Sequence, residues 1–393
     1  MIRTRQIILT LCLLALAGPG AAQSIVRKSF ARAAQQTALM DSLAPAGRFP
    51  ASWEHDGSTR YNSAKGWISG FFPSNIWLLY EYTGDTQWLE AARRRTAQLE
   101  TLRHYNQIHD VGFMVGYPCT LGYRLTGDDY YKQLIIDSSN ALLTRFSPTV
   151  GLIRSWNNKN GKENPYRVII DNMMNLEMLF YASELTGDSR YRDIAVIHAD
   201  NTLKNHFRAD NSCFHILCYD AETGKVVTQQ GGQGYSQTSA WSRGQSWGLY
   251  GFTMCYRFTH DRRYLDRAVK SADYFINHPN LPDDKVPYWD HYAPEIPDKP
   301  RDASAAAITA SALLELAKYV PEKEKRYYKT AKKILRSLAS DRNLVPAGAK
   351  NGFLIDHSVG AKPSNSQVDV PIIYGDYYFL EALLRLKNYK NHK

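Results

Sequence analysis

The chain is poor in cysteine, with five in 393 residues. One of them, Cys12, lies inside an N-terminal apolar run. The other four, at positions 119, 213, 218 and 255, are too few for a disulfide-dense scaffold. Cys213, His215 and Cys218 have a spacing that metal ligands can use, but no second half completes a four-ligand set. We therefore predict neither a metal site nor a disulfide framework.

Long apolar runs are also scarce. The one clear run, Ile7 to Leu16, follows Arg3 and Arg5 and precedes the small residues Gly18 to Ala22. It is too short to span a bilayer and has the order of a secretory signal. We predict that residues 1–22 are a cleaved signal peptide and that the mature protein is periplasmic or secreted, with no membrane span. The alternative is a retained N-terminal anchor.

The sequence has no Pro/Ser/Gly-rich linker and no low-complexity tract, so we expect residues 23–393 to form a single domain. It also has no nucleotide-binding loop, because Gly231-Gly232-Gln233-Gly234 lacks the Lys-Ser/Thr that would follow. The formal charge of +10 favours anionic partners. A glycan, a nucleic acid or an anionic surface would each fit, but nothing else supports nucleic acid.

A short motif recurs along the chain and sets the architecture. It appears at 82–85, 125–128 and 185–188 as an aromatic or leucine followed by Thr-Gly-Asp, and in degenerate form at 259–261 as Thr-His-Asp. Glycine takes the left-handed conformation that ends one helix, and aspartate caps the start of the next. Each copy therefore predicts a tight turn between two antiparallel helices.

The helices on the two sides of the motif differ in kind. The segment 86–103 is amphipathic, whereas 173–180 is apolar nearly all round, which is typical of a buried helix. We predict six inner helices at 65–82, 109–124, 169–184, 240–258, 301–317 and 371–386. We predict six outer helices at 26–43, 86–104, 128–145, 188–206, 261–277 and 323–339.

These twelve helices predict an all-α (α/α)6 toroid with an inner and an outer ring. An open helical solenoid is the alternative, but solenoids end in polar caps. The last helix here, Ile372 to Leu386, is aromatic and apolar, which favours closure of 26–43 onto 371–386.

The long connections should all lie at the end opposite the tight turns, where the inner helices begin. Polar and aromatic residues gather at those beginnings: Gly66-Trp67, His109-Asp110, Asp171-Asn172, Trp241 to Trp247, Arg301-Asp302 and Gly375-Asp376. A single aspartate there is most often a helix cap. Several carboxylates beside Trp, His and Arg indicate a site for a sugar, with Arg243 suited to hold a carboxylate.

These segments resemble glycoside hydrolase family 88, the unsaturated glucuronyl hydrolases, over nearly the whole mature chain. The resemblance is carried by Gly66–Pro73, His109–Phe113, Ile170–Leu176, Trp241–Trp247, Arg301–Ala305 and Gly375–Tyr378. It implies the same (α/α)6 barrel. It implies Asp171 as the general acid and base and Asp110 as its partner carboxylate. It implies that Trp67, His215, Gln233, Arg243 and Trp247 surround the uronate. His109 and Asp302, at the same mouth, complete the predicted substrate-binding residues.

The resemblance also implies the reaction. The substrate would be an anionic oligosaccharide, cut by a lyase, whose terminal uronate carries a C4=C5 double bond. Asp171 would protonate C4 and activate the water that attacks C5, and no cofactor is needed. We expect repulsion by Asp110 to raise the pKa of Asp171. The alternatives are a polysaccharide lyase on a related helical toroid and a non-catalytic glycan-binding protein.

The connection before the last inner helix, 357–366, combines Lys362 with hydroxyl groups, Ser364 among them. We expect it to lie over the mouth and to hold a sulfate, which with the basic chain favours sulfated glycosaminoglycan fragments. The alternative is a solvated loop with an ordinary surface lysine.

Overall fold

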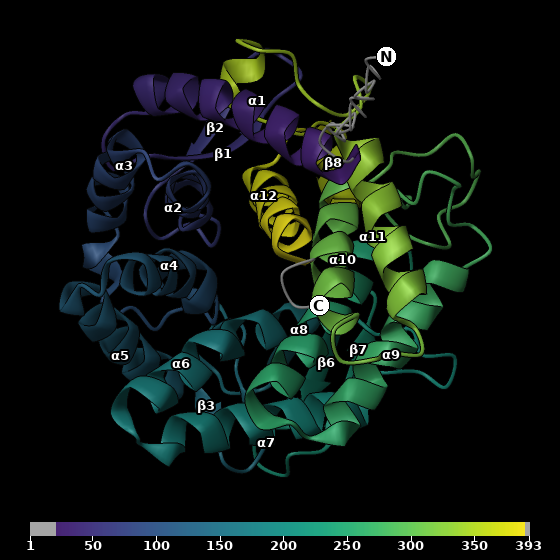
Figure 1. Ribbon diagram of the computed structural model, residues 1–393. Coiled ribbons are helices and arrows are strands. Elements are labelled where there is room, and N and C mark those ends of the chain that lie inside the picture. Colours follow the sequence, from purple (N-terminus) through teal and green to yellow (C-terminus); the bar gives the residue numbers. More distant parts are fainter. Residues whose placement is uncertain (1–20, 390–393) are drawn as a thin grey trace, which may run out of the picture.

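The structure is a computed structural model that describes residues 21–389. The predicted signal peptide, 1–22, lies outside the described residues except for its last two, which begin the first helix. Within the described residues, two concentric rings of helices form a closed barrel (Figure 1). The outer ring consists of α1 (Ala21–Leu43), α3 (Thr86–Ala97), α5 (Asp129–Leu143), α7 (Ser189–Asn205), α9 (Arg262–Asn277) and α11 (Glu324–Leu338). The inner ring consists of α2 (Phe71–Thr83), α4 (Tyr117–Thr126), α6 (Leu176–Thr186), α8 (Ser242–Thr259), α10 (Ala303–Leu316) and α12 (Ile373–Asn388).

The two ends of the chain close the ring. The last inner helix, α12, packs between α10 and α2, and α1 packs against α12 and α2. Every residue of the inner helix α10 is buried, whereas the outer helices α9 and α11 bury one face. The predicted (α/α)6 toroid is confirmed, and the open solenoid is wrong.

The repeated motif forms the predicted turns. Gly84, Gly127 and Gly187 end α2, α4 and α6 with φ of 70°, 69° and 74°. His260 takes the same left-handed conformation, with φ of 56°, at the end of α8. The aspartate after each of them caps the next helix by accepting the backbone N–H two residues on. One end of the barrel is therefore closed by four very short turns.

Three inner helices begin later than the sequence predicted, all at the other end. The segment 65–70 is a turn, and the α-helix starts at Phe71. A π-helical turn, Gly112–Gly116, precedes α4, and a 3₁₀ turn, Ile170–Asn175, precedes α6. Here the chains approach closely: a Cβ on Gly70 would lie 2.1 Å from the carbonyl oxygen of Phe113. Backbones packed this tightly leave no room for a regular first turn, and such turns are frequent at functional sites.

The outer helix predicted to reach 104 also ends early, at Ala97, with a 3₁₀ turn at Glu100–Leu102 after it. The long connections hold short antiparallel strands. They pair as β1 (Phe49–Trp53) with β2 (Thr59–Asn62), β3 (Phe146–Ser147) with β4 (Leu152–Ile153), and β8 (Ser358–Ala361) with β9 (Ser366–Val370). A three-stranded sheet joins β5 (Tyr166–Ile169), β6 (Ile216–Tyr219) and β7 (Val226–Gln230). Every one of these strands lies in a connection that precedes an inner helix, at the open end of the barrel.

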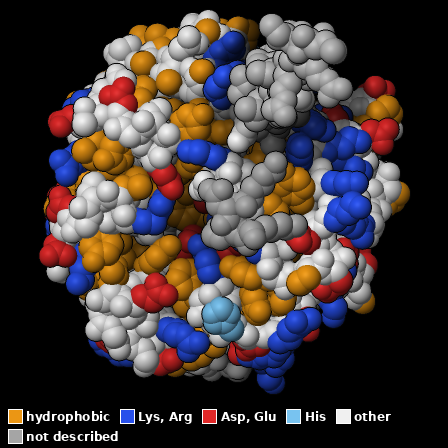
Figure 2. Space-filling view, viewed as in Figure 1, with side chains coloured by type: hydrophobic (Ala, Val, Ile, Leu, Met, Phe, Trp, Pro, Cys, Tyr) orange, Lys and Arg blue, Asp and Glu red, His pale blue; other side chains and the backbone are white. Residues whose placement is uncertain are grey.

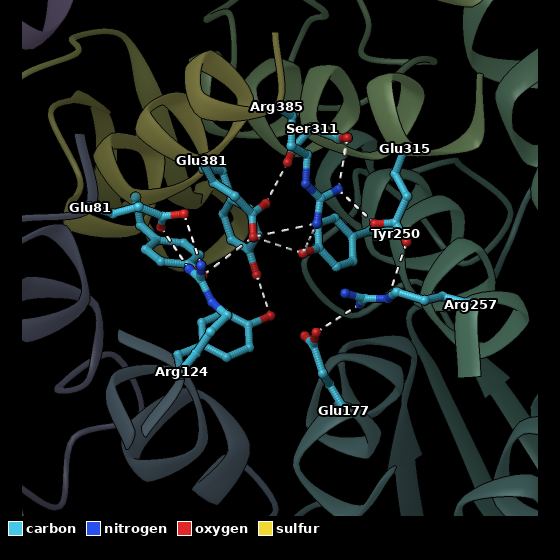
Figure 3. Close-up of polar contacts among 12 residues, drawn as sticks. Glu81, Arg124, Glu177, Tyr250, Arg257, Ser311, Glu315, Glu381 and Arg385 are labelled. Carbon is cyan, nitrogen blue, oxygen red and sulfur yellow. Dashed lines mark hydrogen bonds and ion pairs between the residues drawn. The ribbon is translucent and has the colours of Figure 1, made fainter. Parts of the chain in front are cut away.

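The closed end holds a ring of charged side chains, to which all six inner helices contribute (Figure 3). Its members are Glu81, Arg124, Glu177, Arg257, Glu315 and Arg385, with Glu381 of α12 at 3.5 Å from Arg385. Arg124 binds Glu81 at 2.6 Å, Arg257 binds Glu177 at 2.7 Å and Glu315 at 3.2 Å, and Arg385 binds Glu315 at 2.9 Å. The ring borders a cavity of about 310 Å³. Figure 2 looks onto this face and shows a hollow near its centre, with acidic and basic side chains around it.

We expect Glu315→Gln to destabilise the barrel by about 3–5 kcal/mol, because it leaves two guanidinium groups without their shared partner in a buried network. The side chain of Glu315 is only 8 % exposed. The measurement is the free energy of unfolding in urea. The matched control is Asp266→Asn, which removes an exposed ion pair with Arg262 and should change stability by less than about 1 kcal/mol. Equal effects of the two variants would contradict a stabilising role of the ring.

Candidate active site

Two carboxylates meet where neighbouring inner helices begin. Asp110 precedes the π-helical turn that leads into α4, and Asp171 lies in the 3₁₀ turn that leads into α6. Asn175 links the two turns, because its Oδ1 accepts the N–H of Phe113 at 3.2 Å. Asp110 is 6 % exposed and Asp171 8 %. The structure therefore brings the two aspartates together, at the open end of the barrel and almost out of water.

Burial changes the acidity of both carboxyl groups. It raises the pKa of Asp171 to about 6, against the opposing charge of Arg243. Burial also raises the pKa of Asp110 well above its usual range, and the charge of Asp171 raises it further. We had expected repulsion to act on Asp171. Desolvation instead accounts for the shift of Asp171, and the repulsion is seen at Asp110.

His215 faces Asp171 because of the sheet. It directly precedes β6, and β6 pairs with β5, the strand that leads into Asp171. Its Nδ1 accepts the backbone N–H of Gln233 at 2.9 Å. Burial, with the charge of Arg243, lowers the pKa of His215 to about 3, so the ring is neutral. A neutral ring that accepts at Nδ1 carries its proton on Nε2, and Nε2 lies 3.5 Å from Asp171 Oδ2.

This arrangement of His215 requires a glycine in the connection 231–239. Gly232 has φ of 57°, and a Cβ at that position would lie 2.0 Å from His215 Nδ1. Both the backbone conformation and the close approach exclude a side chain. The glycine-rich segment that lacked the features of a nucleotide loop thus fixes the histidine tautomer.

Arg243 lies in the first turn of α8 and is occupied by protein partners. It donates to Gln233 Oε1 at 2.8 Å and to the carbonyl of Gly360 at 2.7 Å, and it also binds the carbonyl of Val359. Its guanidinium packs over the ring of Trp241, at 4.5 Å. Arg243 therefore joins the connection at Gln233 to the β8–β9 hairpin. Direct binding of the uronate by Arg243 stays a prediction, and only its Nε lacks a partner among the described residues.

Asp302 has no exposed surface and caps α10, accepting the N–H groups of Ser304 and Ala305 at 3.0 and 3.3 Å. It also faces Arg243 at 3.4 Å. The structure thus gives Asp302 the ordinary role of a helix cap, with an influence on the site through Arg243. Because the residue has no exposed surface, the structure does not support its predicted contact with substrate.

The two predicted tryptophans differ in exposure. Trp67 is half-buried in the turn before α2 and packs against Tyr374, with ring centres 5.3 Å apart. It is available as a platform for a sugar. Trp247 is fully buried between Phe113 and Tyr378. Its indole N–H has no hydrogen-bond partner among the described residues, so Trp247 acts on the site through packing.

His109 is also fully buried, with Nε2 at 3.2 Å from Asp110 Oδ1. Burial lowers its pKa to about 3, so it is a neutral neighbour of Asp110.

Lys362 and Ser364 lie in a 3₁₀ turn between β8 and β9. This hairpin contacts the site because the carbonyls of Val359 and Gly360 accept hydrogen bonds from Arg243.

Trp156 is a site residue that the sequence analysis missed. It is half-buried in the connection before β5, pairs with Ile108 in an isolated bridge, and lies edge-on to His109 with ring centres 6.4 Å apart. The candidate residues predicted from the sequence lie mainly at the beginnings of the inner helices, and Trp156 does not. An aromatic residue in a long polar connection was the signal that could have found it.

No group of three or more His, Cys, Asp or Glu within 21–389 is arranged to hold a metal ion. Cys119, Cys213, Cys218 and Cys255 are buried and unpaired. In the same range, no helix has the length and apolar character needed to cross a membrane.

Two buried carboxyl groups at the mouth of a helical toroid, with tryptophan and histidine around them, define a glycoside hydrolase. The chain belongs to glycosyl hydrolase family 88, whose model matches residues 44–390. An unsaturated glucuronyl hydrolase of Formosa agariphila is 47 % identical over 329 residues, which are 83 % of this chain and 81 % of the relative. An unsaturated chondroitin disaccharide hydrolase of Streptococcus agalactiae is 38 % identical, over 81 % of each chain. The crystal structure of an unsaturated glucuronyl hydrolase specific for heparin has a TM-score of 0.91 and 40 % identity, covering 94 % of this chain and 98 % of that one.

The raised pKa of Asp171 predicts a pH-dependent stability. A carboxyl group whose pKa rises from about 3.9 in the unfolded chain to about 6 in the fold stabilises the fold when protonated and loses this contribution as pH rises through 6. Asp171→Asn cannot ionise. We therefore expect it to gain stability over the wild type, on the order of 2 kcal/mol, between pH 4 and pH 7.5. Urea unfolding at both pH values measures this, and parallel curves for the two proteins would contradict it.

Proposed function

We propose that this enzyme hydrolyses lyase-generated oligosaccharides, releasing a terminal 4,5-unsaturated uronic acid, with glycosaminoglycan fragments as the substrate class. The observation that carries the proposal is the pair Asp110 and Asp171, buried at the mouth, with the pKa of Asp171 near neutrality. The named activities of the relatives, on unsaturated glucuronyl and chondroitin disaccharide substrates, support the same class. The basic composition favours an anionic substrate.

The chemistry differs from ordinary glycoside hydrolysis, in which two carboxylates act at the anomeric carbon. The C4=C5 double bond of the substrate is conjugated to the carboxylate and attached to the ring oxygen, so it is an enol ether. Asp171 donates its proton to C4, and positive charge develops at C5 and the ring oxygen. Water then attacks C5 while the Asp171 carboxylate accepts its proton. The resulting hemiketal opens, and the rest of the glycan leaves.

One residue can serve as acid and then as base when its pKa lies near the working pH. Desolvation gives Asp171 that pKa. The Nε2–H of neutral His215 faces its carboxylate and favours the charged form after proton transfer. Burial and the charge of Asp171 raise the pKa of Asp110 well above its usual range, so Asp110 favours its neutral form beside a charged Asp171. Arg243 holds Gln233, and Gln233 in turn holds His215, so their effect is one of positioning.

Two other classes make different products. A polysaccharide lyase creates the conjugated double bond and its ultraviolet absorbance, this hydrolase removes it, and a non-catalytic binding protein leaves it unchanged. The family and the paired aspartates favour hydrolysis. We further propose that the protein is exported to the periplasm or secreted, because residues 1–22 have the composition of a signal peptide.

Asp171→Asn should lower kcat by about 10²–10⁴-fold, because it removes the group that transfers the proton. The assay follows the loss of ultraviolet absorbance of an unsaturated disaccharide. Asp110→Asn should also be severe, with a changed pH profile. The circular dichroism of both variants should match the wild type. Activity of Asp171→Asn within a few-fold of the wild type would exclude it as the acid.

The β8–β9 hairpin predicts a preference for sulfated substrates. Lys362 is half-buried at its turn, and the hairpin contacts Arg243 at the mouth. Lys362→Ala should lower kcat/KM for a sulfated unsaturated disaccharide, since a charge-assisted contact contributes about 1.5–3 kcal/mol. The unsulfated counterpart is the control and should be unaffected. Equal losses on both substrates, or none on either, would remove Lys362 from sulfate recognition.

A further inference from the structure

A second polar pocket lies at the open end of the barrel, beside the segment that carries Asp110. It has a volume of about 290 Å³ and is formed between the end of α5 and the connection that leads to β5. The residues that matter here are Asn106, Gln107, Arg145, Arg154, Asn157 and Glu163. The sequence analysis did not single out any of them, and the proposed reaction does not use them.

Two buried arginines give the pocket an excess of positive charge. Arg145 and Arg154 are each 8 % exposed. Arg145 donates to the carbonyls of Arg154, at 2.9 Å, and of Asn106. Arg154 donates to the carbonyl of Glu163 at 2.8 Å and also binds its carboxylate, but the side chain of Glu163 is 73 % exposed. The exposed carboxylate of Glu163 pairs with Arg154 alone, and such a carboxylate is readily displaced by water or by a ligand.

Each of the two arginines has a nitrogen without a hydrogen-bond partner among the described residues. Arg145 Nη2 and Arg154 Nε have no partner within 21–389, although both are out of water. Burial, together with the neighbouring charge of Arg154, lowers the pKa of Arg145 to about 10. Leaving buried charged donors unpaired is costly, and an anionic group between them would relieve that cost.

The segments that line the pocket lie next to those that form the active site. The side chain of Asn157 donates to that of Gln107 at 3.3 Å, across the pocket rim. The residue before Asn157 is Trp156, which pairs with Ile108 and stands edge-on to His109. His109 is in turn the neighbour of Asp110. A glycan whose terminal uronate lies at Asp110 would therefore pass Trp156 on its way to the two arginines.

We propose that this pocket is an accessory subsite, which holds an anionic group on a sugar beyond the first two of the substrate. The inference rests on the proposed function. Both anions of a glycosaminoglycan, a sulfate ester and the carboxylate of an internal uronate, have oxygens that a guanidinium binds well. A disaccharide substrate is too short to use the subsite, whereas a tetrasaccharide reaches it.

The test places a negative charge at the rim without removing any internal contact of the arginines. Gln107 is exposed, and Gln107→Glu keeps its size. The matched control is Gln35→Glu, an identical change at an exposed position of the outer helix α1. Both variants and the wild type are assayed on unsaturated disaccharides and tetrasaccharides, each unsulfated and sulfated. A second rim variant, Asn157→Asp, repeats the test from the other side.

We expect Gln107→Glu and Asn157→Asp to lower kcat/KM for tetrasaccharides by about three- to fivefold, the range of a partly exposed charge interaction. Disaccharide turnover should be unchanged, and Gln35→Glu should change neither. Loss on both tetrasaccharides identifies the carboxylate as the bound group, and loss on the sulfated one alone identifies the sulfate. Equal effects on disaccharides and tetrasaccharides, or none, overturn the subsite alone. A wild type that hydrolyses none of the four substrates overturns the proposed function and the subsite with it.

Discussion

The left-handed turn that joins an inner helix to the next outer helix is the constraint on which the site depends. Gly84, Gly127 and Gly187 complete the reversal within one or two residues, so these turns leave little chain at that end. The long connections therefore lie at the other end. The strands, the irregular helix beginnings and every residue of the candidate site are found there.

The irregular beginnings follow from the same constraint. The inner helices are closest to one another at the mouth, where Gly70 touches the backbone of Phe113 and a Cβ on Gly112 would meet Asn175. A regular α-helical turn would need more space than these contacts leave. The π-helical and 3₁₀ turns that replace it carry Asp110 and Asp171 at the open end of the barrel. The close packing of the inner helices at the mouth therefore also determines where the two aspartates lie.

The sequence predicted the features that depend on local chemistry. The Gly-Asp motif determines a cap and a turn without help from the rest of the chain, and the apolar character of a helix determines its ring. Features that depend on contacts between distant segments were not predictable in this way. The tautomer of His215 depends on a backbone N–H eighteen residues further along the chain. The hydrogen bonds of Arg243 depend on carbonyl groups more than a hundred residues further along the chain. The family resemblance named both residues as site residues, but only the three-dimensional contacts show which neighbours Arg243 holds.

Burial affects the carboxyl groups of Glu315, at the closed end, and Asp171, at the open end, in opposite ways. At the closed end, burial acts to raise the pKa of Glu315, but Arg257 and Arg385 together hold it below its ordinary range. That carboxylate is permanently ionised and serves as a link between helices. At the open end, Asp171 lies opposite a neutral histidine, and the nearest guanidinium, Arg243, is engaged by backbone carbonyls. Desolvation therefore prevails there, and the pKa of Asp171 rises to about 6. Such a group is a poor contributor to stability near neutral pH but can give up and take back a proton.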